Sequence, residues 1–374
     1  MSRIIDLADH PGVYAARLLA ETGNEVIRVE SPDGDVLRRT GPFLGNKPDL
    51  EKGAYHQFFN AGKRSLKLNL NMPEGRRVLL DLIRTADAVV ASTPLPLEDG
   101  EALDVNPRLV LVRINNDEPE LCAVARSGLL ALTGHPGKRP VLLGGHVVYA
   151  GTGLYVAVAT AAALVSLQLT GQGQVVDVSI RQCMESLVEQ AMVDYKAWGR
   201  VTERCGYRGA ITAVSGAFPC NDGYWMVSVP HSAEGWAKFV DWVQDPVLSA
   251  DPSLADEAER DAKKELVVER LGMWSQQFSK LDIVTEAQKR HVPASPLSTP
   301  LDLVNDPQLT TRGFLAETDH PDFGRILFPR GAIGSLWGTR LAPAPTLGQH
   351  NDQILKGLGY TDSDLKALAD SGAV

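Results

Sequence analysis

Residues 140–176 read PVLLGGHVVYAGTGLYVAVATAAALVSLQLTGQGQVV and contain no Asp, Glu, Lys or Arg. Pro140 and several glycines interrupt the first part, and Gly171 and Gly173 end it as a helix C-cap would. The remainder, residues 151–169, predicts one helix rich in Ala, Val and Leu. Because this helix is apolar all round, we expect it to be buried on every face, as a core helix rather than a membrane span.

The composition limits the classes of function. A chain of 374 residues exceeds one ordinary core, so two domains or one large α/β unit are expected. The net charge of −9 argues against a nucleic-acid partner, although a local pocket can still bind a small anion. The four cysteines have no C-x-x-C spacing, so we expect reduced thiols and no metal. The first residues, MSRIIDLADHPG, have no signal-peptide core, and we expect a cytoplasmic protein without membrane partners.

The N-terminal half alternates strand and helix signals. Residues 3–7 and 25–29 are short apolar runs typical of buried strands, and residues 13–22 between them have helical periodicity. Further strands are predicted over residues 65–70, 88–91 and 109–114, with a helix over 73–84. This order is typical of a parallel sheet covered by helices on both faces. The first loop lacks G-x-G-x-x-G, so NAD and FAD are not expected.

The second half changes character. A strand over residues 175–179 is followed by a long predicted helix over 180–198, with Ser179 as its N-cap. Short aromatic strands around an Asn-Asp-Gly turn and a charged helical stretch then predict a small α+β domain. We expect a large Rossmann-like domain in residues 1–199, the small domain in 200–305, and a C-terminal segment, 306–374, that returns to the large domain.

Several polar residues are candidates for a site. Arg38, Arg39, Lys63 and Arg64 lie near predicted strand ends, where they could bind a phosphate or simply form a solvated basic loop. His146 and Tyr149 precede the apolar helix, and a lone histidine beside apolar residues is more often a core group than a catalyst. Glu120 is a candidate acid–base group, but it could instead be an acid that stabilises a helix N-terminus. His350 is a further candidate and could equally be a surface residue. The residues alone indicate a two-domain α/β protein with a candidate anion site.

The sequence also resembles family III CoA-transferases of the CaiB/BaiF type, the group of formyl-CoA transferase, carnitine-CoA transferases and α-methylacyl-CoA racemase. The matching segments occur in the family's order and are RLLAETGNEVIRVESPDGD, FNAGKRSLKLNLNMPEG, NPRLVLVRI, SGLLALTG followed by GLYVAVATAAAL, TGQGQVVDVSI, DGYW, VPASPLSTPLDLVNDPQLTTRGF and APAPTLGQHNDQILKGLGY. They extend over nearly the whole chain.

This resemblance implies a Rossmann-like large domain, a small second domain and two chains interlocked as a dimer. It implies an acyl-CoA and a carboxylic acid as substrates. It places coenzyme A on loops that match His10, Pro11, Arg38 and Leu68, with Lys63 and Arg64 nearby. In the family, an Asp carboxylate attacks the thioester, forms a mixed anhydride and then carries CoA to the acceptor acid.

The chain departs from the family pattern at the nucleophile. The family's Asp stands four residues before the glycine that matches Gly153, which is the position of Tyr149. A tyrosine with an ordinary pKa near 10 is a poor nucleophile at neutral pH and cannot form the acyl anhydride. The His–Asp pair of the racemases would fall at Pro119 and Tyr149. The segment STPLP, residues 92–96, replaces a common Asn-Phe-Arg-Pro-Gly segment on the CoA side.

Three hypotheses follow from this departure. In the first, the chain is a CoA-transferase subunit without its own nucleophile, paired with a homologous chain that carries the Asp. In the second, it is an active homodimer that acts on an acyl-CoA through His146, Tyr149 or Glu120 as acid and base. In the third, it binds acyl-CoA without catalysis.

Overall fold

The computed structural model covers all 374 residues and describes them except residues 96, 98, 116–117, 208–214, 230 and 331–341. The chain divides into two compact units. Unit 1 comprises Met1–Leu129, Leu143–Met192 and Pro307–Val374, and unit 2 comprises Leu130–Leu142 and Val193–Asp306. Each unit has its own core and is described separately.

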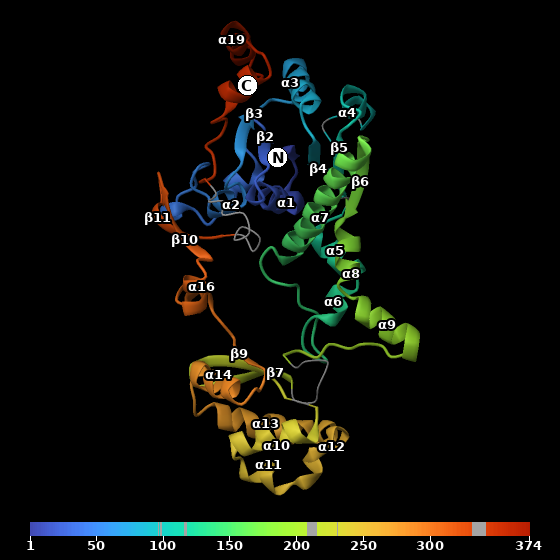
Figure 1. Ribbon diagram of the computed structural model, residues 1–374, viewed down its shortest axis with the longest axis vertical. Coiled ribbons are helices and arrows are strands. Elements are labelled where there is room, and N and C mark those ends of the chain that lie inside the picture. Colours follow the sequence, from blue (N-terminus) through green and yellow to red (C-terminus); the bar gives the residue numbers. More distant parts are fainter. Residues whose placement is uncertain (96, 98, 116–117, 208–214, 230, 331–341) are drawn as a thin grey trace. The chain divides into compact units, whose positions relative to one another are not determined.

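The described part of unit 1 contains a six-stranded parallel sheet (Figure 1). Its strands are β1 (Arg3–Leu7), β2 (Glu25–Glu30), β3 (Arg64–Lys67), β4 (Ala88–Ser92), β5 (Val110–Asn115) and β6 (Gln174–Ser179). Their spatial order is β3-β2-β1-β4-β5-β6, the order of a doubly wound Rossmann-type sheet. The predicted α/β class with a parallel sheet is therefore confirmed, and the predicted strands agree with these to within a few residues at their ends.

Helices cover both faces of this sheet because side chains alternate along each strand. On one face, Ile5, Ile27 and Val89 pack with α3 (Pro73–Arg84), α18 (Asn351–Gly357) and α19 (Asp362–Asp370). The opposite face is covered by α1 (His10–Glu21) and α7 (Val147–Thr170). The remaining elements of unit 1 that lie wholly within it are η1 (Val36–Arg39), η2 (Leu44–Asn46), α2 (Ala54–Phe59), α4 (Asp99–Val105), α5 (Glu120–Arg126), α8 (Ile180–Ser186), α16 (Pro307–Thr311) and the hairpin of β10 (Leu315–His320) and β11 (Gly324–Pro329).

The long apolar helix α7 is buried on one face only. Its buried residues include Val148, Val156 and Leu167, whereas Val158 is 69% exposed and Leu169 is 82% exposed. The expectation of burial on every face is therefore wrong for the single chain, because α1 and the sheet can contact only one side of the helix. By length and composition alone, α7 is the single helix among the described residues that could cross a membrane, a property that it shares with core helices of soluble proteins. Gly171 ends it with φ 73°, as the sequence predicted.

Helices α1 and α7 lie side by side (Figure 1). A Cβ atom on Gly153 would come within 3.2 Å of Tyr14 Cβ and 3.3 Å of Ala15 N. A Cβ atom on Gly12 would lie 2.4 Å from both Ala8 Cβ and Ile114 Cδ1. These two glycines therefore set the distance between α7, α1 and the end of the sheet.

The predicted helix over residues 180–198 is divided in the structure. It forms α8 (Ile180–Ser186) and α9 (Glu189–Trp198), with Ser179 capping α8 through a hydrogen bond from the Gln182 N–H. The prediction of a single helix is wrong, because α8 ends at Ser186 with Leu187 as its C-cap, whose N–H bonds to the Met184 and Glu185 carbonyls. Both α9 and α6 (Leu129–Leu132) span the boundary between the two units.

Unit 2 is a small α+β unit built on the antiparallel strands β7 (Ser215–Cys220), β8 (Gly223–Ser228) and β9 (Ala294–Pro296). The Asn221-Asp222 turn joins β7 to β8, as predicted. Trp225 is fully buried and packs with Trp242 and Trp274. The surrounding helices are α10 (Ala233–Val243), α11 (Pro246–Ala250), η3 (Pro252–Ala255), α12 (Glu257–Ala262), α13 (Lys264–Ser275), α14 (Lys280–Lys289) and α15 (Pro300–Val304).

The crowding around Gly12 gives a first prediction. Gly12→Ala should lower the stability of unit 1 by about 1–3 kcal/mol, because Ala8 Cβ cannot move away from the added methyl group. Hydrogen exchange of peptides from α1 and β5 measures this change. Gly357→Ala is the matched control, since a Cβ atom there meets nothing within 4 Å. Equal exchange in the two variants would contradict the packing described here.

Candidate active site

The candidate site lies at the carboxyl ends of β1 and β4, where the strand order of the sheet reverses. Open α/β sheets bind their ligands in the crevice at this point. The Asp9 backbone N–H donates to Ser92 Oγ at 2.8 Å and so joins the two strand ends. Helix α1 begins at the next residue, His10, with Pro11 in its first turn. The site therefore includes a helix N-terminus, which favours negative charge.

Three predicted site residues meet beside the start of α1. The His10 ring stacks on His146, with centroids 5.1 Å apart, and on Tyr149, with centroids 5.6 Å apart. Tyr55 from α2 meets the His146 ring edge-on at 4.6 Å. The rings come from α1, α2 and the start of α7, so three segments distant in sequence form one aromatic cluster.

Burial favours the uncharged forms of His10 and Tyr149. Desolvation lowers the pKa of His10, and the neighbouring His146 lowers it further against the opposing effect of Asp35 and Asp9. Desolvation raises the pKa of Tyr149, and the charge of Glu120 raises it further. The pKa of Glu120 is itself raised by desolvation, with an opposing effect from His146. Tyr149 is thus a neutral phenol that can donate a hydrogen bond, and it has no carboxylate chemistry.

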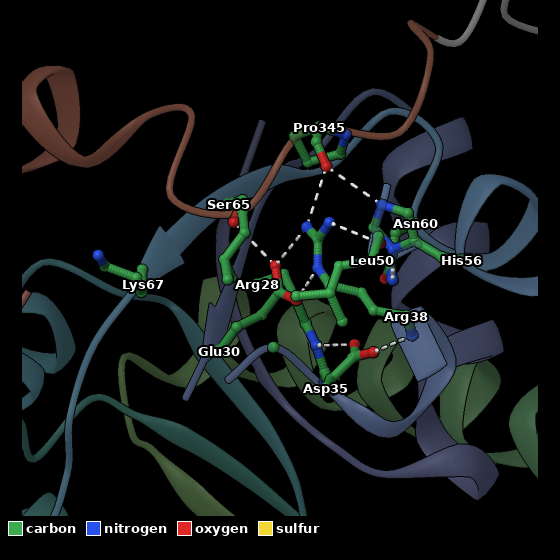
Figure 2. A network of polar contacts seen from close by, with 12 residues as sticks. Arg28, Glu30, Asp35, Arg38, Leu50, His56, Asn60, Ser65, Lys67 and Pro345 are labelled. Atoms are coloured by element: carbon green, nitrogen blue, oxygen red, sulfur yellow. Dashed lines mark hydrogen bonds and ion pairs between the residues drawn. The ribbon is translucent and has the colours of Figure 1, made fainter. Parts of the chain in front are cut away.

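Arg38, predicted to contact CoA, is fully buried in an ion network (Figure 2). Its Nε and Nη2 donate to the Glu30 carboxylate at 2.6 and 2.9 Å, and Nη1 donates to Glu51 Oε2 at 2.6 Å. Nη2 also donates to the Pro345 carbonyl at 3.0 Å. A phosphate could reach this guanidinium only by displacing these partners, so the structure gives the side chain a structural role.

Lys63 is held in the same way. Its Nζ donates to Asp6 Oδ2 at 2.8 Å, to the Val13 carbonyl at 3.0 Å and to Asn60 Oδ1 at 3.0 Å. The three donors of the ammonium group are therefore occupied. The alternative in which Lys63 belongs to a solvated basic loop is wrong, because the side chain is fully buried.

Arg64, Leu68 and His350 have contacts of their own, none of which involves the aromatic cluster. The Arg64 guanidinium pairs with Glu25 at the amino end of β2. The Leu68 side chain lies in the core with α3, while its N–H donates to the Glu30 carbonyl at 2.7 Å. His350 is also in an internal contact, where Nδ1 accepts from the Ser65 N–H at 3.1 Å. Contact between CoA and the predicted residues His10, Pro11, Arg38, Lys63, Arg64 and Leu68 stays a prediction.

Sequence reasoning missed Tyr55 and the acidic half of the ion network. Tyr55 belongs to the segment AYHQFF, whose density of rings is a signal for an aromatic cluster. Asp6 follows two apolar residues near the carboxyl end of β1. A carboxylate buried in a strand needs a cationic or hydrogen-bonding partner, so this residue was a signal for the ion network. Among the described residues, no group of three or more His, Cys, Asp or Glu side chains is placed to hold a metal ion.

The sheet order and its covering helices define a Rossmann-type α/β protein, with the candidate site at the switch point of its sheet. Residues 2–351 match the family described as CoA-transferase family III. The chain belongs to this family. Its homologues are CoA-transferases, enzymes whose substrates are CoA thioesters.

Individual relatives agree with this assignment over their whole length. The succinyl-CoA:(R)-benzylsuccinate CoA-transferase subunit BbsE of Thauera aromatica is 31% identical, covering 100% of this chain and 97% of that protein. The succinyl-CoA:mesaconate CoA-transferase of Haloarcula marismortui is 30% identical, covering 98% of each chain. The crystal structure of a CaiB/BaiF family protein from Brucella suis matches with a TM-score of 0.82 and 25% identity, covering 96% of this chain and 98% of that one.

The contacts of Lys63 distinguish a structural from a ligand-binding role. Lys63→Met should destabilise unit 1 by about 3–5 kcal/mol, because it leaves the buried Asp6 carboxylate without one of its two cationic partners. Chemical denaturation followed by circular dichroism measures the loss. Lys67→Met is the control, because Lys67 lies at the end of β3 and its side chain is only half-buried. A Lys63→Met protein of normal stability with weakened CoA binding would contradict the structural role.

The buried His56 gives a pH dependence. Burial, with a smaller contribution from Arg38, lowers its pKa from 6.5 to about 4. Above pH 6.5 both folded and unfolded states hold it neutral, and its full contribution to stability is present. As the pH falls from 6.5 to about 4, only the unfolded state takes up the proton, so stability falls through this window by roughly 3 kcal/mol.

His56→Gln should therefore flatten this part of the profile of unfolding free energy against pH. The exposed His135→Gln is the matched control for the loss of one imidazole from the protein. If His56→Gln and the wild type lost stability in parallel between pH 6.5 and 4, the imidazole would not be the group responsible.

Proposed function

We propose that this chain is the non-nucleophilic subunit of a family III CoA-transferase that moves CoA between carboxylic acids. The proposal rests on the resemblance, which implies that Tyr149 stands at the position of the family's Asp. The observation that supports it is that Tyr149 takes part in a stack with His10 and His146. A neutral phenol cannot form the acyl anhydride through which CoA transfer proceeds. A homologous chain with Asp at this position would supply the nucleophile.

The uncovered face of α7 supports a partner chain. Large apolar residues along this helix are about half to four-fifths exposed, namely Leu154, Val158, Val165 and Leu169. Contiguous exposed apolar surface of this kind marks an interaction site. The predicted interlocked dimer would cover it, and the name of the relative from Thauera aromatica describes that protein as a subunit.

The alternative of an active homodimer has one observation in its favour. Glu120, His146 and Tyr149 interact electrostatically, and the pKa of the carboxyl group is raised toward a range useful for proton transfer. In that case these residues would exchange a proton with an acyl-CoA without a covalent intermediate. The two proposals differ in whether the phenol and imidazole are needed for turnover.

Native mass and subunit composition test the proposal first. The protein isolated from its own cells should form a one-to-one complex with a homologous chain that carries the Asp. In that complex, Tyr149→Phe should leave kcat for CoA transfer within about twofold, because the ring stack persists and the phenol is not a nucleophile. Replacing the sibling's Asp by Asn should abolish the hydroxylamine-sensitive acyl-enzyme.

The double variant His146→Asn, Tyr149→Phe separates the alternatives. Loss of turnover in this variant, in a protein that is a self-paired dimer, would establish the acid–base enzyme instead. A self-paired dimer with full transferase activity and an acyl group on this chain would overturn both proposals.

A further inference from the structure

Arg28 in β2 is a buried cation with more contacts than its charge requires. Its Nη1 donates to Asp6 Oδ1 at 2.9 Å, and its Nε donates to Asp35 Oδ2 at 3.2 Å. With Lys63 as the second partner of Asp6, two cations here face two carboxylates, so the charges are balanced. Arg28 Nη1 nevertheless also donates to the Ala8 backbone carbonyl, which is a neutral group. This further bond indicates a role beyond charge neutralisation.

Ala8 lies in the short loop between β1 and α1, outside both elements. The Ala8 N–H donates to Asp6 Oδ1 at 3.0 Å, and the Asp9 N–H donates to Ser92 Oγ at 2.8 Å. In the part of the chain that the structure describes, the Ala8 carbonyl has no donor other than Arg28. Ala8 is fully buried, so water cannot replace that donor. Arg28 therefore fixes the side of the loop that faces β2.

The loop continues from Asp9 into His10, whose ring belongs to the aromatic cluster. This ring stacks on His146 and on Tyr149, with centroids 5.1 and 5.6 Å apart. Stacked rings slide over one another at little cost, because offset arrangements over a range of distances are all favourable. The rings alone therefore do not fix His10, and its position depends on the backbone of Ala8 and Asp9.

An arginine suits this role better than a lysine. The register of β1 with β2 places Arg28 directly opposite Asp6. From there a planar guanidinium presents donors on several nitrogens, so that it reaches Asp6, Asp35 and the Ala8 carbonyl at once. A lysine carries all of its donors on one nitrogen at the end of a flexible stem. It can keep a carboxylate partner, but a single nitrogen cannot occupy the places of Nη1 and Nε at the same time.

We propose that Arg28 is a positioning residue for the loop between β1 and α1. Its bond to the Ala8 carbonyl sets the place of the His10 ring, and with it the shape of the CoA site at the carboxyl end of β1. The inference rests on the proposed function in one respect, that CoA binds at this loop. Arg28 itself would not contact the ligand, because the side chain is buried and bound to its three partners.

NMR of the histidine rings tests the position of His10. Labelled histidine is placed in this chain alone, the chain is kept in its native assembly, and the His10 ring signals are assigned with His10→Gln. In Arg28→Lys these signals should move toward those of the exposed His291, because the ring leaves its stack. A purely structural role of Arg28 would lower stability without moving His10 in the folded protein. Arg113→Lys is the matched control, since Arg113 in β5 pairs with Asp177 of the adjacent strand through two hydrogen bonds of 2.7 Å.

Titration with CoA, followed at the same signals, reports the site of this chain. The dissociation constant of CoA should rise about tenfold in Arg28→Lys and stay unchanged in Arg113→Lys. If Arg28→Lys does not fold, Asp35→Asn replaces it. This change weakens one side of the guanidinium's contacts, keeps the pair with Asp6, and should move the His10 signals in the same direction by less.

Two outcomes overturn the inference. They are His10 signals that stay in place in the folded variant, and a moved ring with unchanged CoA affinity. A wild-type His10 that does not respond to CoA would overturn the proposed CoA site on this chain, and the inference with it. The subunit role proposed for the chain is judged separately, by the composition of the native assembly.

Discussion

The buried carboxylate of Asp6 is the point on which unit 1 depends. Its two oxygens accept from the Ala8 N–H, from Arg28 Nη1 at 2.9 Å and from Lys63 Nζ at 2.8 Å, and the carboxylate is fully buried. An isolated charge at this depth is very costly, so the folded state needs both cations beside the carboxylate. The two cations thereby fix the end of β1 against β2 and against the segment before β3.

The network extends from there to the C-terminal segment. Arg38 and His56 both donate to the Pro345 carbonyl (Figure 2). The Leu347 N–H donates to Glu51 Oε1, and the Gly348 N–H donates to Ser65 Oγ. These hydrogen bonds join residues some three hundred positions apart, beside the apolar packing of Leu66 with Ile354 and Leu355. The ion network also limits how an anionic ligand can bind. The cations beside these strand ends neutralise the chain's own carboxylates, so an anion at this edge would have to be bound by groups outside the network and by the N-terminus of α1.

The strands of unit 1 could be predicted from the sequence because their signals are local. An apolar run such as residues 3–7, bounded by polar turns, has few other ways to bury its side chains. The role of Arg38 could not be predicted in this way. A basic residue on a loop has the same sequence context whether it faces solvent or Glu30, and only the tertiary fold decides between them. Tyr55 was missed for the same reason, since its partner His146 is about ninety residues away.

The error over α7 has a different origin. Composition shows that a helix avoids water but does not identify what covers it, and a single chain offers α7 only one layer of neighbours. The same helix carries Tyr149 in its first turn. The proposed subunit role explains both the exposed face of α7 and the tyrosine in its first turn. Tyr149 contributes ring contacts that preserve the start of the helix, and the exposed face preserves the surface for a partner. A chain without the nucleophile could then no longer form the acyl intermediate itself. It would still keep the ring stack at the start of α7 and the exposed face of α7 to which a catalytic sibling chain binds.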